Sequence, residues 1–394
     1  MNKSILLFAA VLLSVPFVMV SCDKSKKRFL FDVVEQDYVN KSSQTVHGVE
    51  VKEQLPLGAS DIFVCDTFIV VMTSGGQQPR MHVYSTNWQP LGEFCNIGRA
   101  RNEFLSYPKL LSGQYYRKPD GTVLIPLMDG ASNGVKMMDL TESVKRQNTV
   151  ITRYREDLKG IWTVIANRDN MKIKFGSRRD VILLNEDMNL TFEYNNSVND
   201  YPDYYGEPYF GVRQDTTEIR RIRLLQEVEG EEMEYFGGRI IKHPHRNLIV
   251  QPLSSLDYIL FFDMDNDHMF AVHQKGSASF DGKLPEYVRT EGVTEDGTPY
   301  YEDNLVEHFG YPAFAESYFM VLYYAGDYGA GSADPENPVA ELMFFDWDGK
   351  FLKSVKLDTS VWSITYDENN HILYGMDMFT ESLYSFDLTS VLPD

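Results

Sequence analysis

Short polar turns between alternating apolar runs are the main pattern in this chain, and residues 343–355 show it most clearly. This segment reads MFFDWDGKFLKSV, in which two β-prone runs flank an Asp-Gly pair. An Asp-Gly pair between alternating apolar residues is typical of a β-hairpin turn. The same order of apolar run, polar turn and apolar run returns at residues 82–94, 136–144, 183–194, 260–272 and 383–391. The chain therefore carries six copies of one predicted hairpin.

The spacing of these copies predicts the architecture. Equivalent points in the copies are Ser85, Asp139, Asp187, Asp263, Asp346 and Asp387, and they are separated by 54, 48, 76, 83 and 41 residues. Repeats of roughly 40 to 50 residues are typical of four-stranded propeller blades, and longer steps leave room for insertions. We therefore predict an all-β fold, a single six-bladed β-propeller of four-stranded antiparallel blades over residues 29–394.

Neither end of the repeat array contains enough strands for a complete blade. Seven residues follow Asp387, too few for the outer strand of a last blade, and residues 29–55 hold short β-like runs without a complete blade. Because an open sheet edge is a liability, we predict that an N-terminal strand from this segment closes the ring. In the first blade, Cys65 and Cys95 fall on the first and fourth strands. Strand spacing puts them about 14 Å apart, so both are expected to be free thiols.

Two long segments interrupt the repeat. Residues 195–231 contain the aromatic run YPDYYGEPYF at 201–210, followed by a charged stretch whose periodicity leaves strand and helix open. Residues 275–309 contain scattered glycines and acids, which is typical of a long loop. The run at 201–210 is expected in the connection between the third and fourth blades. Loops of such length in a compact fold are usually functional or mobile.

The N-terminus has the features of an export signal. An apolar run at residues 5–20 follows Lys3 and is too short to favour a membrane span. The sequence MVSC at 19–22 resembles a bacterial lipobox, in which cleavage precedes a lipidated cysteine, and an ordinary signal with an incidental cysteine is the alternative. We predict a lipoprotein signal peptide at 1–21, lipidation at Cys22 and a basic tether at 22–28. The protein would then contact a membrane through its N-terminal lipid.

The chain as a whole is acidic, with a formal net charge of −20. Such a surface repels phosphate backbones and argues against a nucleic-acid partner.

A short motif follows the first predicted blade. Residues 97–104 read IGRARNEF, and Pro108 comes four residues later. This run, with the lipobox and the blade count, resembles the passage from the first to the second blade in the TolB-like six-bladed propeller lipoproteins of Bacteroidetes. Gly98, Glu103, Phe104 and Pro108 match that pattern, whereas Ala100 stands where the family has a second glycine. The resemblance implies the fold and a lipid-anchored place in the cell envelope. We expect the periplasmic side of the outer membrane, although leaflet and surface exposure stay open, because the basic residues after Cys22 do not resemble the acidic export signal of surface lipoproteins in this phylum. The resemblance implies no catalytic residue.

Two polar clusters could be taken for metal sites. Residues 263–267, DMDND, begin like a calcium loop, but His268 and Gln274 stand where Gly and Glu are required, so a hairpin turn is favoured. His243 and His245 flank a proline between two β-like runs, where a turn is again expected and no third ligand is apparent. No serine-nucleophile, phosphate-loop or Cys-His signature occurs in the chain. We therefore predict no metal, no cofactor and no catalytic residue.

Aromatic residues begin several of the predicted inner strands, which start at Asp61, Tyr107, Ile161, Gly238, Tyr311 and Val361. Aromatic faces stack on sugars and apolar ligands, although a packing role is the alternative. The candidate ligand-binding residues are Trp162, Trp362, Tyr107, Tyr311, Tyr204, Tyr205 and Tyr209. The prediction is a monomeric, non-catalytic binding or scaffolding module for a glycan or an envelope protein. The alternative is a propeller hydrolase, lactonase or lyase that acts on a saccharide or lactone.

Overall fold

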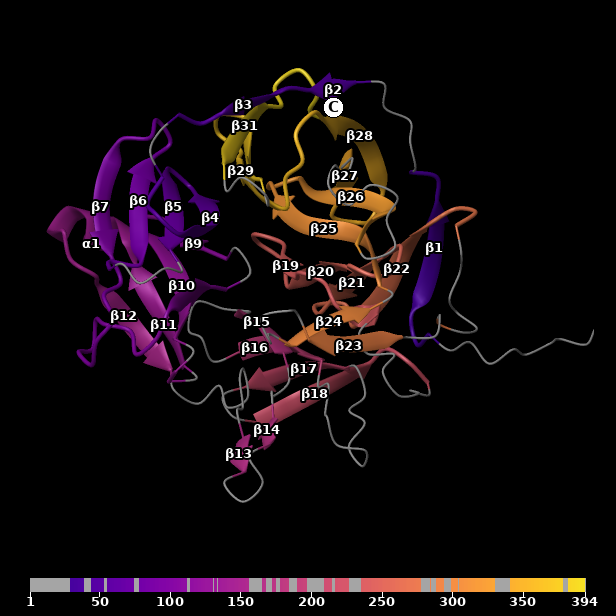
Figure 1. Ribbon diagram of the computed structural model, residues 1–394, viewed down its shortest axis with the longest axis horizontal. Coiled ribbons are helices and arrows are strands. Elements are labelled where there is room, and N and C mark those ends of the chain that lie inside the picture. The colour runs from indigo at the N-terminus through magenta and orange to yellow at the C-terminus, as the bar shows by residue number, and fades with distance from the viewer. Residues whose placement is uncertain are drawn as a thin grey trace, which may run out of the picture.

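The computed structural model of the chain is an all-β propeller (Figure 1). It describes residues 29–393, with gaps at 39–43, 53–54, 74–77, 112–113, 130, 133, 156–164, 168–171, 175–177, 184–189, 197–208, 215–216, 227–234, 278–283, 285–287, 294–298, 304, 330–340 and 378–381. Within these ranges there is one α-helix, α1 (Leu140–Arg146).

Five sheets form blades, each named here by its innermost strand. The β4 blade contains β4 (Ala59–Cys65), β5 (Phe68–Thr73), β6 (Met81–Ser85) and β7 (Pro90–Phe94). The β8 blade contains β8 (Pro108–Leu110), β9 (Tyr116–Arg117), β10 (Val123–Asp129), β11 (Gly134–Asp139) and β12 (Ile151–Arg155). The β19 blade contains β19 (Ile241–Lys242), β20 (Leu248–Pro252), β21 (Tyr258–Asp263) and β22 (His268–Gln274). The β25 blade contains β25 (Val306–Phe314), β26 (Tyr318–Gly329), β27 (Glu341–Asp346) and β28 (Phe351–Leu357). The β29 blade contains β29 (Ser363–Asp367), β30 (Ile372–Met376) and β31 (Leu383–Asp387).

A further four-stranded antiparallel sheet lies between the β8 and β19 blades in Figure 1. It contains β15 (Arg178–Leu183), β16 (Leu190–Asn196), β17 (Tyr209–Gln214) and β18 (Thr217–Arg223). Two small hairpins stand apart from the larger sheets: β13 (Ile165–Asn167) with β14 (Lys172–Lys174), and β23 (Arg289–Val293) with β24 (Pro299–Asp303). The expectation that residues 201–210 lie in a connection between blades is therefore wrong for Tyr209 and Phe210, which belong to β17. The loop predicted at 275–309 likewise contains the β23–β24 hairpin and the start of β25.

The N-terminal segment runs along the outer edges of three blades. β3 (Gly48–Glu50) pairs antiparallel with β31 and supplies the outer strand of the β29 blade, which confirms the predicted N-terminal closure. Two additions were not predicted. β1 (Asp32–Gln36) pairs parallel with β22, and β2 (Thr45–Val46) pairs parallel with β28. We call residues 29–38 and 44–50 the strap, because their strands pair with the β19, β25 and β29 blades in turn.

Four of the six predicted hairpins are found, at residues 82–94, 183–194, 260–272 and 343–355, but they do not all occupy the same position in their sheets. The predicted hairpin at 383–391 is wrong, because only β31 forms there and a turn follows it. Residues 82–94, 260–272 and 343–355 form the β6–β7, β21–β22 and β27–β28 hairpins. Residues 183–194 instead span the end of β15 and most of β16, which are the first two strands of their sheet. The predicted hairpin at 136–144 is wrong, because β11 leads directly into helix α1. The Asp139 carboxylate accepts the Glu142 N–H at 2.7 Å as an N-cap.

The passage from the β4 blade to the β8 blade is held by an exposed turn hydrogen bond and by a buried polar cluster. Glu103 accepts the Ala100 N–H at 2.8 Å, while the Phe104 ring is fully buried among residues of both blades. Lys136 Nζ donates to the Glu103 carbonyl and lies 3.6 Å from the Asp129 carboxylate, and both charged side chains are almost completely buried. Asp129 in turn accepts the Leu105 N–H at 2.9 Å. The Gly98 to Pro108 motif thus forms a rigid joint between the two blades.

Cys65 and Cys95 are both free, as predicted, and both are buried. Burial raises the pKa of each thiol far above its usual range.

Candidate functional site

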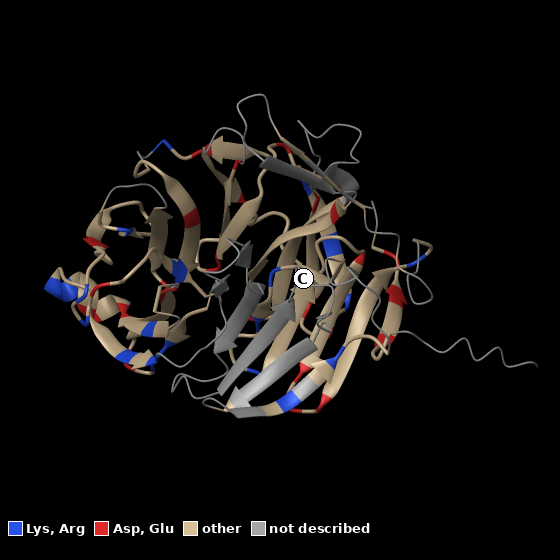
Figure 2. Cartoon of the chain, turned by 60° about the horizontal axis from the view of Figure 1, so that its bottom comes forward, with Lys and Arg blue, Asp and Glu red and all other residues tan. Residues whose placement is uncertain are grey.

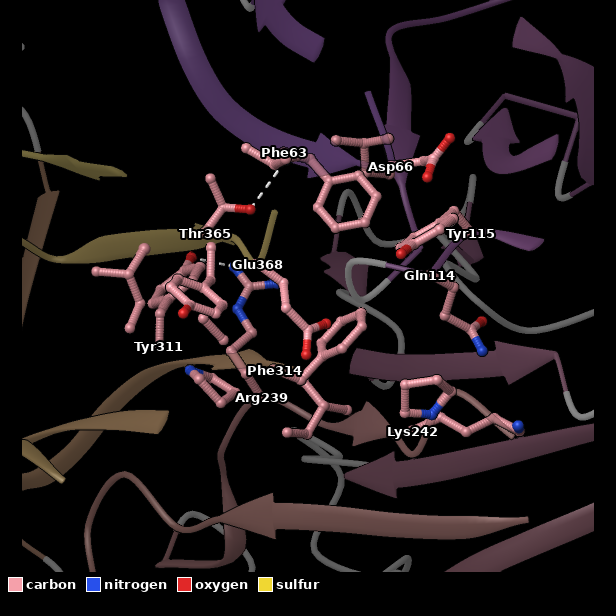
Figure 3. Close-up of a pocket in the computed structure, with 18 of the residues that line it drawn as sticks. Phe63, Asp66, Gln114, Tyr115, Arg239, Lys242, Tyr311, Phe314, Thr365 and Glu368 are labelled. Carbon is pink, nitrogen blue, oxygen red and sulfur yellow. Dashed lines mark hydrogen bonds between the residues drawn. The ribbon is translucent and has the colours of Figure 1, made fainter. Parts of the chain in front are cut away.

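The inner strands of the five blades converge on a cavity of about 490 Å³. Its walls come from five parts of the chain: strand β4, the connection from β8 to β9, the segment that leads into β19, strand β25 and strand β29. Figure 3 shows Arg239 and Tyr311 on one wall and Gln114 and Tyr115 on the opposite one. The cavity is therefore a property of the whole ring rather than of any single blade.

Asp61, Arg239 and Tyr311 form the chemical centre of this cavity. They come from three different blades: Asp61 from β4, Arg239 from the residues before β19, and Tyr311 from β25. The Arg239 guanidinium lies 4.5 Å from the centroid of the Tyr311 ring and also donates to the Tyr311 hydroxyl. Burial raises the pKa of the half-buried Asp61 carboxyl to about 6, although attraction from Arg239 lowers it in part. The site thus offers a stacked cation and a carboxyl group that titrates near neutral pH.

The opposite wall is aromatic and carries one ion pair. The rings of Phe63 and Tyr115 lie 6.0 Å apart, and the Arg117 guanidinium lies 3.2 Å from the Asp66 carboxylate. Burial raises the pKa of the Tyr115 hydroxyl to about 12, and nearby acidic groups add to the effect. Tyr115 is therefore a neutral hydrogen-bonding group at physiological pH.

Acidic groups mark the edge of the cavity. The exposed Glu368 carboxylate accepts the Glu316 N–H at 3.0 Å, and the Glu316 side chain lies 3.6 Å from His245 Nε2. Tyr366 lies beside them, with its hydroxyl 3.1 Å from that of Tyr318. These groups can accept hydrogen bonds from a polyhydroxylated ligand.

The two polar clusters of the sequence are turns in this structure. His243 Nδ1 accepts the N–H groups of His245 and Arg246 at 3.0 and 3.2 Å, and burial lowers its pKa to about 4. The His243 ring also packs 4.8 Å from that of Trp347. Asp263 Oδ1 accepts the N–H groups of Asp265 and Asn266, both at 3.1 Å, in the β21–β22 turn. Across the described residues, no group of three His, Cys, Asp or Glu side chains is placed to hold a metal ion.

The structure separates the aromatic residues that the sequence grouped together. Tyr311 lines the cavity. Trp362 lies behind it, with ring centroids 5.2 Å apart in an edge-on arrangement, so it supports Tyr311 rather than facing the cavity. Tyr107 lies elsewhere, against Arg80, and Tyr209 is a residue of β17. Trp162, Tyr204 and Tyr205 lie outside the described residues.

Sequence reasoning missed the polar members of the site. Asp61 and Arg239 stand at the predicted starts of inner strands, but only aromatic residues were selected there. The signal was available, because both are charged residues at the predicted starts of inner strands, the part of a blade nearest the central cavity. Tyr115 follows β8 in a loop, and no sequence pattern marked it.

These observations define an all-β propeller with a polar and aromatic cavity at its centre. No family model matches the chain, and no curated protein sequence matches it. A putative exported protein of Bacteroides fragilis is similar in structure, with TM-score 0.47 and 9% identity over 90% of this chain and 98% of that one. A DUF4221 family member from Bacteroides vulgatus has TM-score 0.46 and 10% identity over 89% and 98% of the two chains. The β-propeller domain of Cps50 (Swd1) from Myceliophteria thermophila has TM-score 0.40 and 9% identity over 87% and 100%. At such identities the likeness concerns the fold alone.

The distribution of charged residues does not point to a second binding surface. Acidic and basic residues are interspersed over the described blades rather than gathered on one face (Figure 2). Within the described residues, no helix is long and apolar enough to cross a membrane.

Proposed function

We propose that this chain is a non-catalytic binding module of the cell envelope, which holds a glycan or a polar loop of a partner protein in its central cavity. The observation that carries the proposal is the convergence of Asp61, Arg239 and Tyr311 from three blades on one cavity. Each group is contributed by a separate blade, so only the closed ring assembles the site. Concave sites with aromatic walls and a few convergent polar groups are the usual form of ligand sites.

A saccharide fits the chemistry of the walls. Rings such as Tyr311 and Phe63 present flat apolar faces, while Arg239, Asp61 and Gln114 supply donors and acceptors for hydroxyl groups. An aromatic contact contributes about 0.5 to 1.5 kcal/mol beyond its buried area, so the several rings present are needed together.

The number of blades and the cellular location are part of the same proposal. The β15–β18 sheet would be the third of six blades in a TolB-like propeller at 29–394. Cys22 would carry the lipid after removal of residues 1–21, with 22–28 as the tether. The protein would then be a monomer anchored at the periplasmic side of the outer membrane, without a nucleic-acid partner.

The test is an array of bacterial envelope glycans probed with the purified full chain in detergent. We expect selective binding that falls at least tenfold in Arg239→Gln and in Tyr311→Leu. Arg246→Gln is the matched control, because Arg246 lies just beyond the cavity and pairs with Asp263 and Asp348. Binding that survives both cavity variants, or an array without any bound glycan, would contradict the proposal.

A hydrolase or lyase is the second candidate, and Asp61 is the observation that favours it. A carboxyl group with a pKa near 6 in a cavity is suited to general acid–base work. If the protein is such an enzyme, the full chain releases product from a bound saccharide or lactone, and Asp61→Asn abolishes turnover while binding persists. Unchanged glycan after prolonged incubation with the full chain would leave the binding module as the function.

A further inference from the structure

Arg80 is a buried cation outside the central cavity. Arg80 immediately precedes β6, its guanidinium lies over the ring of Tyr107, which precedes β8, and the residue is 4% exposed. The Nε and Nη1 atoms are buried and have no hydrogen-bond partner in the structure. Among the described residues, no carboxylate forms an ion pair with this guanidinium.

Such an arrangement is unfavourable for the folded chain alone. A buried charge is normally paired or hydrogen-bonded, because loss of hydration costs far more than packing returns. Among the described residues, the guanidinium has a favourable contact with the Tyr107 ring, whose centroid lies 4.2 Å from Arg80 Cζ. A cation–π contact compensates only part of the lost hydration. A counter-anion would supply the rest.

We propose that Arg80 and Tyr107 form a binding site for an oxyanion, the carboxylate or phosphate group of a ligand. Guanidinium groups bind both kinds of oxyanion through charge-assisted hydrogen bonds. Tyr107 covers the guanidinium and is itself 45% exposed, so rotation of this one side chain opens the site to solvent.

The rest of the site is preorganised. The Arg80 main chain is fixed on both sides, because its N–H donates to the Phe94 carbonyl at 3.1 Å and its carbonyl accepts the Thr73 N–H at 3.0 Å. On the other blade, the N–H groups of Leu105 and Ser106, just before Tyr107, are held by the Asp129 carboxylate. Neither Arg80 nor Tyr107 lines the central cavity, so this site is separate from the proposed glycan site.

The experiment titrates the full chain in detergent with sodium phosphate and, separately, with sodium acetate. Sodium chloride at equal ionic strength is the reference, and the thermal midpoint and the heat of binding are recorded. We expect a saturable rise of the midpoint with at least one oxyanion. A response to phosphate alone indicates that the ligand carries a phosphate group. A response to acetate, with or without one to phosphate, indicates that the site also binds carboxylates.

Variants decide whether Arg80 carries the response. Arg80→Gln should abolish it, and Arg80→Lys should weaken binding about tenfold, because lysine lacks the planar fork. Arg146→Gln is the matched control, since Arg146 is an exposed cation paired with Glu142 on α1. If Arg80→Gln does not fold, the Arg80→Lys and unmodified chains still give the comparison. No saturable response in the unmodified chain, or an equal response in Arg80→Lys or Arg80→Gln, would overturn the proposal.

Discussion

At the scale of single residues, the cavity contains a carboxyl group, that of Asp61, whose burial disfavours ionisation. The pKa of Asp61 in the folded chain is about 6, above its ordinary value of 3.8. The folded chain therefore binds this proton more tightly than the unfolded chain does between these pH values. Stability contributed by Asp61 is present below pH 4 and is lost as pH rises to 6.

Asp61→Asn should remove this dependence. At about 1.36 kcal/mol per pKa unit, the free energy of unfolding of the variant relative to the unmodified chain should rise by about 1 to 3 kcal/mol between pH 4 and 7. Urea denaturation at several pH values measures this difference. Asp66→Asn is the control, because Asp66 lies in the same cavity but is paired with Arg117, so its loss should not reproduce that rise. A pH-independent difference for Asp61→Asn would contradict the raised pKa.

At the scale of elements, local signals identified hairpins but not their partners. The Asp346 to Gly349 turn is encoded by four adjacent residues, and the structure forms it there. Whether a hairpin supplies the inner or the outer pair of strands depends on contacts between distant residues, as residues 183–194 show. Residues 140–146 fit either a strand or a helix by polarity, and the Asp139 cap with the burial of Leu140 selects the helix. The site was predicted only in part for the same reason. The position of Tyr311 on an inner strand can be read from the sequence, but its contact with Arg239 joins distant residues and cannot.

Helix α1 gives a test of that local argument. Asp139→Ala removes the side-chain acceptor for the Glu142 N–H and should lower the free energy of unfolding by about 1 kcal/mol. Asp139→Ser, which keeps a capping oxygen, should recover most of the loss. Urea denaturation provides the measurement, and equal destabilisation by both variants would show that the cap is not the cause.

The strap offers a second test at this scale, through Tyr38. Its hydroxyl donates to Asp257 Oδ1 at 2.6 Å, and both residues are almost fully buried. Tyr38→Phe leaves Asp257 with one hydrogen bond fewer in a buried place, so the free energy of unfolding should fall by about 1 to 3 kcal/mol. Tyr84→Phe is the control, because Tyr84 is packed against Trp88 and no hydrogen bond of its hydroxyl is described. A Tyr38→Phe chain as stable as the control would mean that the strap is held by packing alone.

At the scale of the whole molecule, the repeated hairpin predicted a propeller and its N-terminal closure, but not the route of the strap. The closure followed from counting, since too few residues remain after Asp387 to complete a blade. Counting strands does not predict the parallel pairing of β1 and β2, because β22 and β28 are the edge strands of blades that already have four strands. Short runs such as Thr45–Val46 also carry too little pattern to name a partner.

The strap therefore fastens the ring at three edges rather than one, and its removal should affect more than the last blade. A chain beginning at Leu57 loses the outer strand of the β29 blade, the added strands on β22 and β28, and the buried Tyr38 ring. Each lost hydrogen bond contributes about 1 kcal/mol, and each exposed edge invites pairing with another chain. We expect this variant to melt at least 10 °C lower than the full chain, or to aggregate, in differential scanning calorimetry. A chain beginning at Phe29 is the control and should melt with the full chain. If the chain beginning at Leu57 melted as high as that control, the blades would be stable without the strap and the argument for closure would fail.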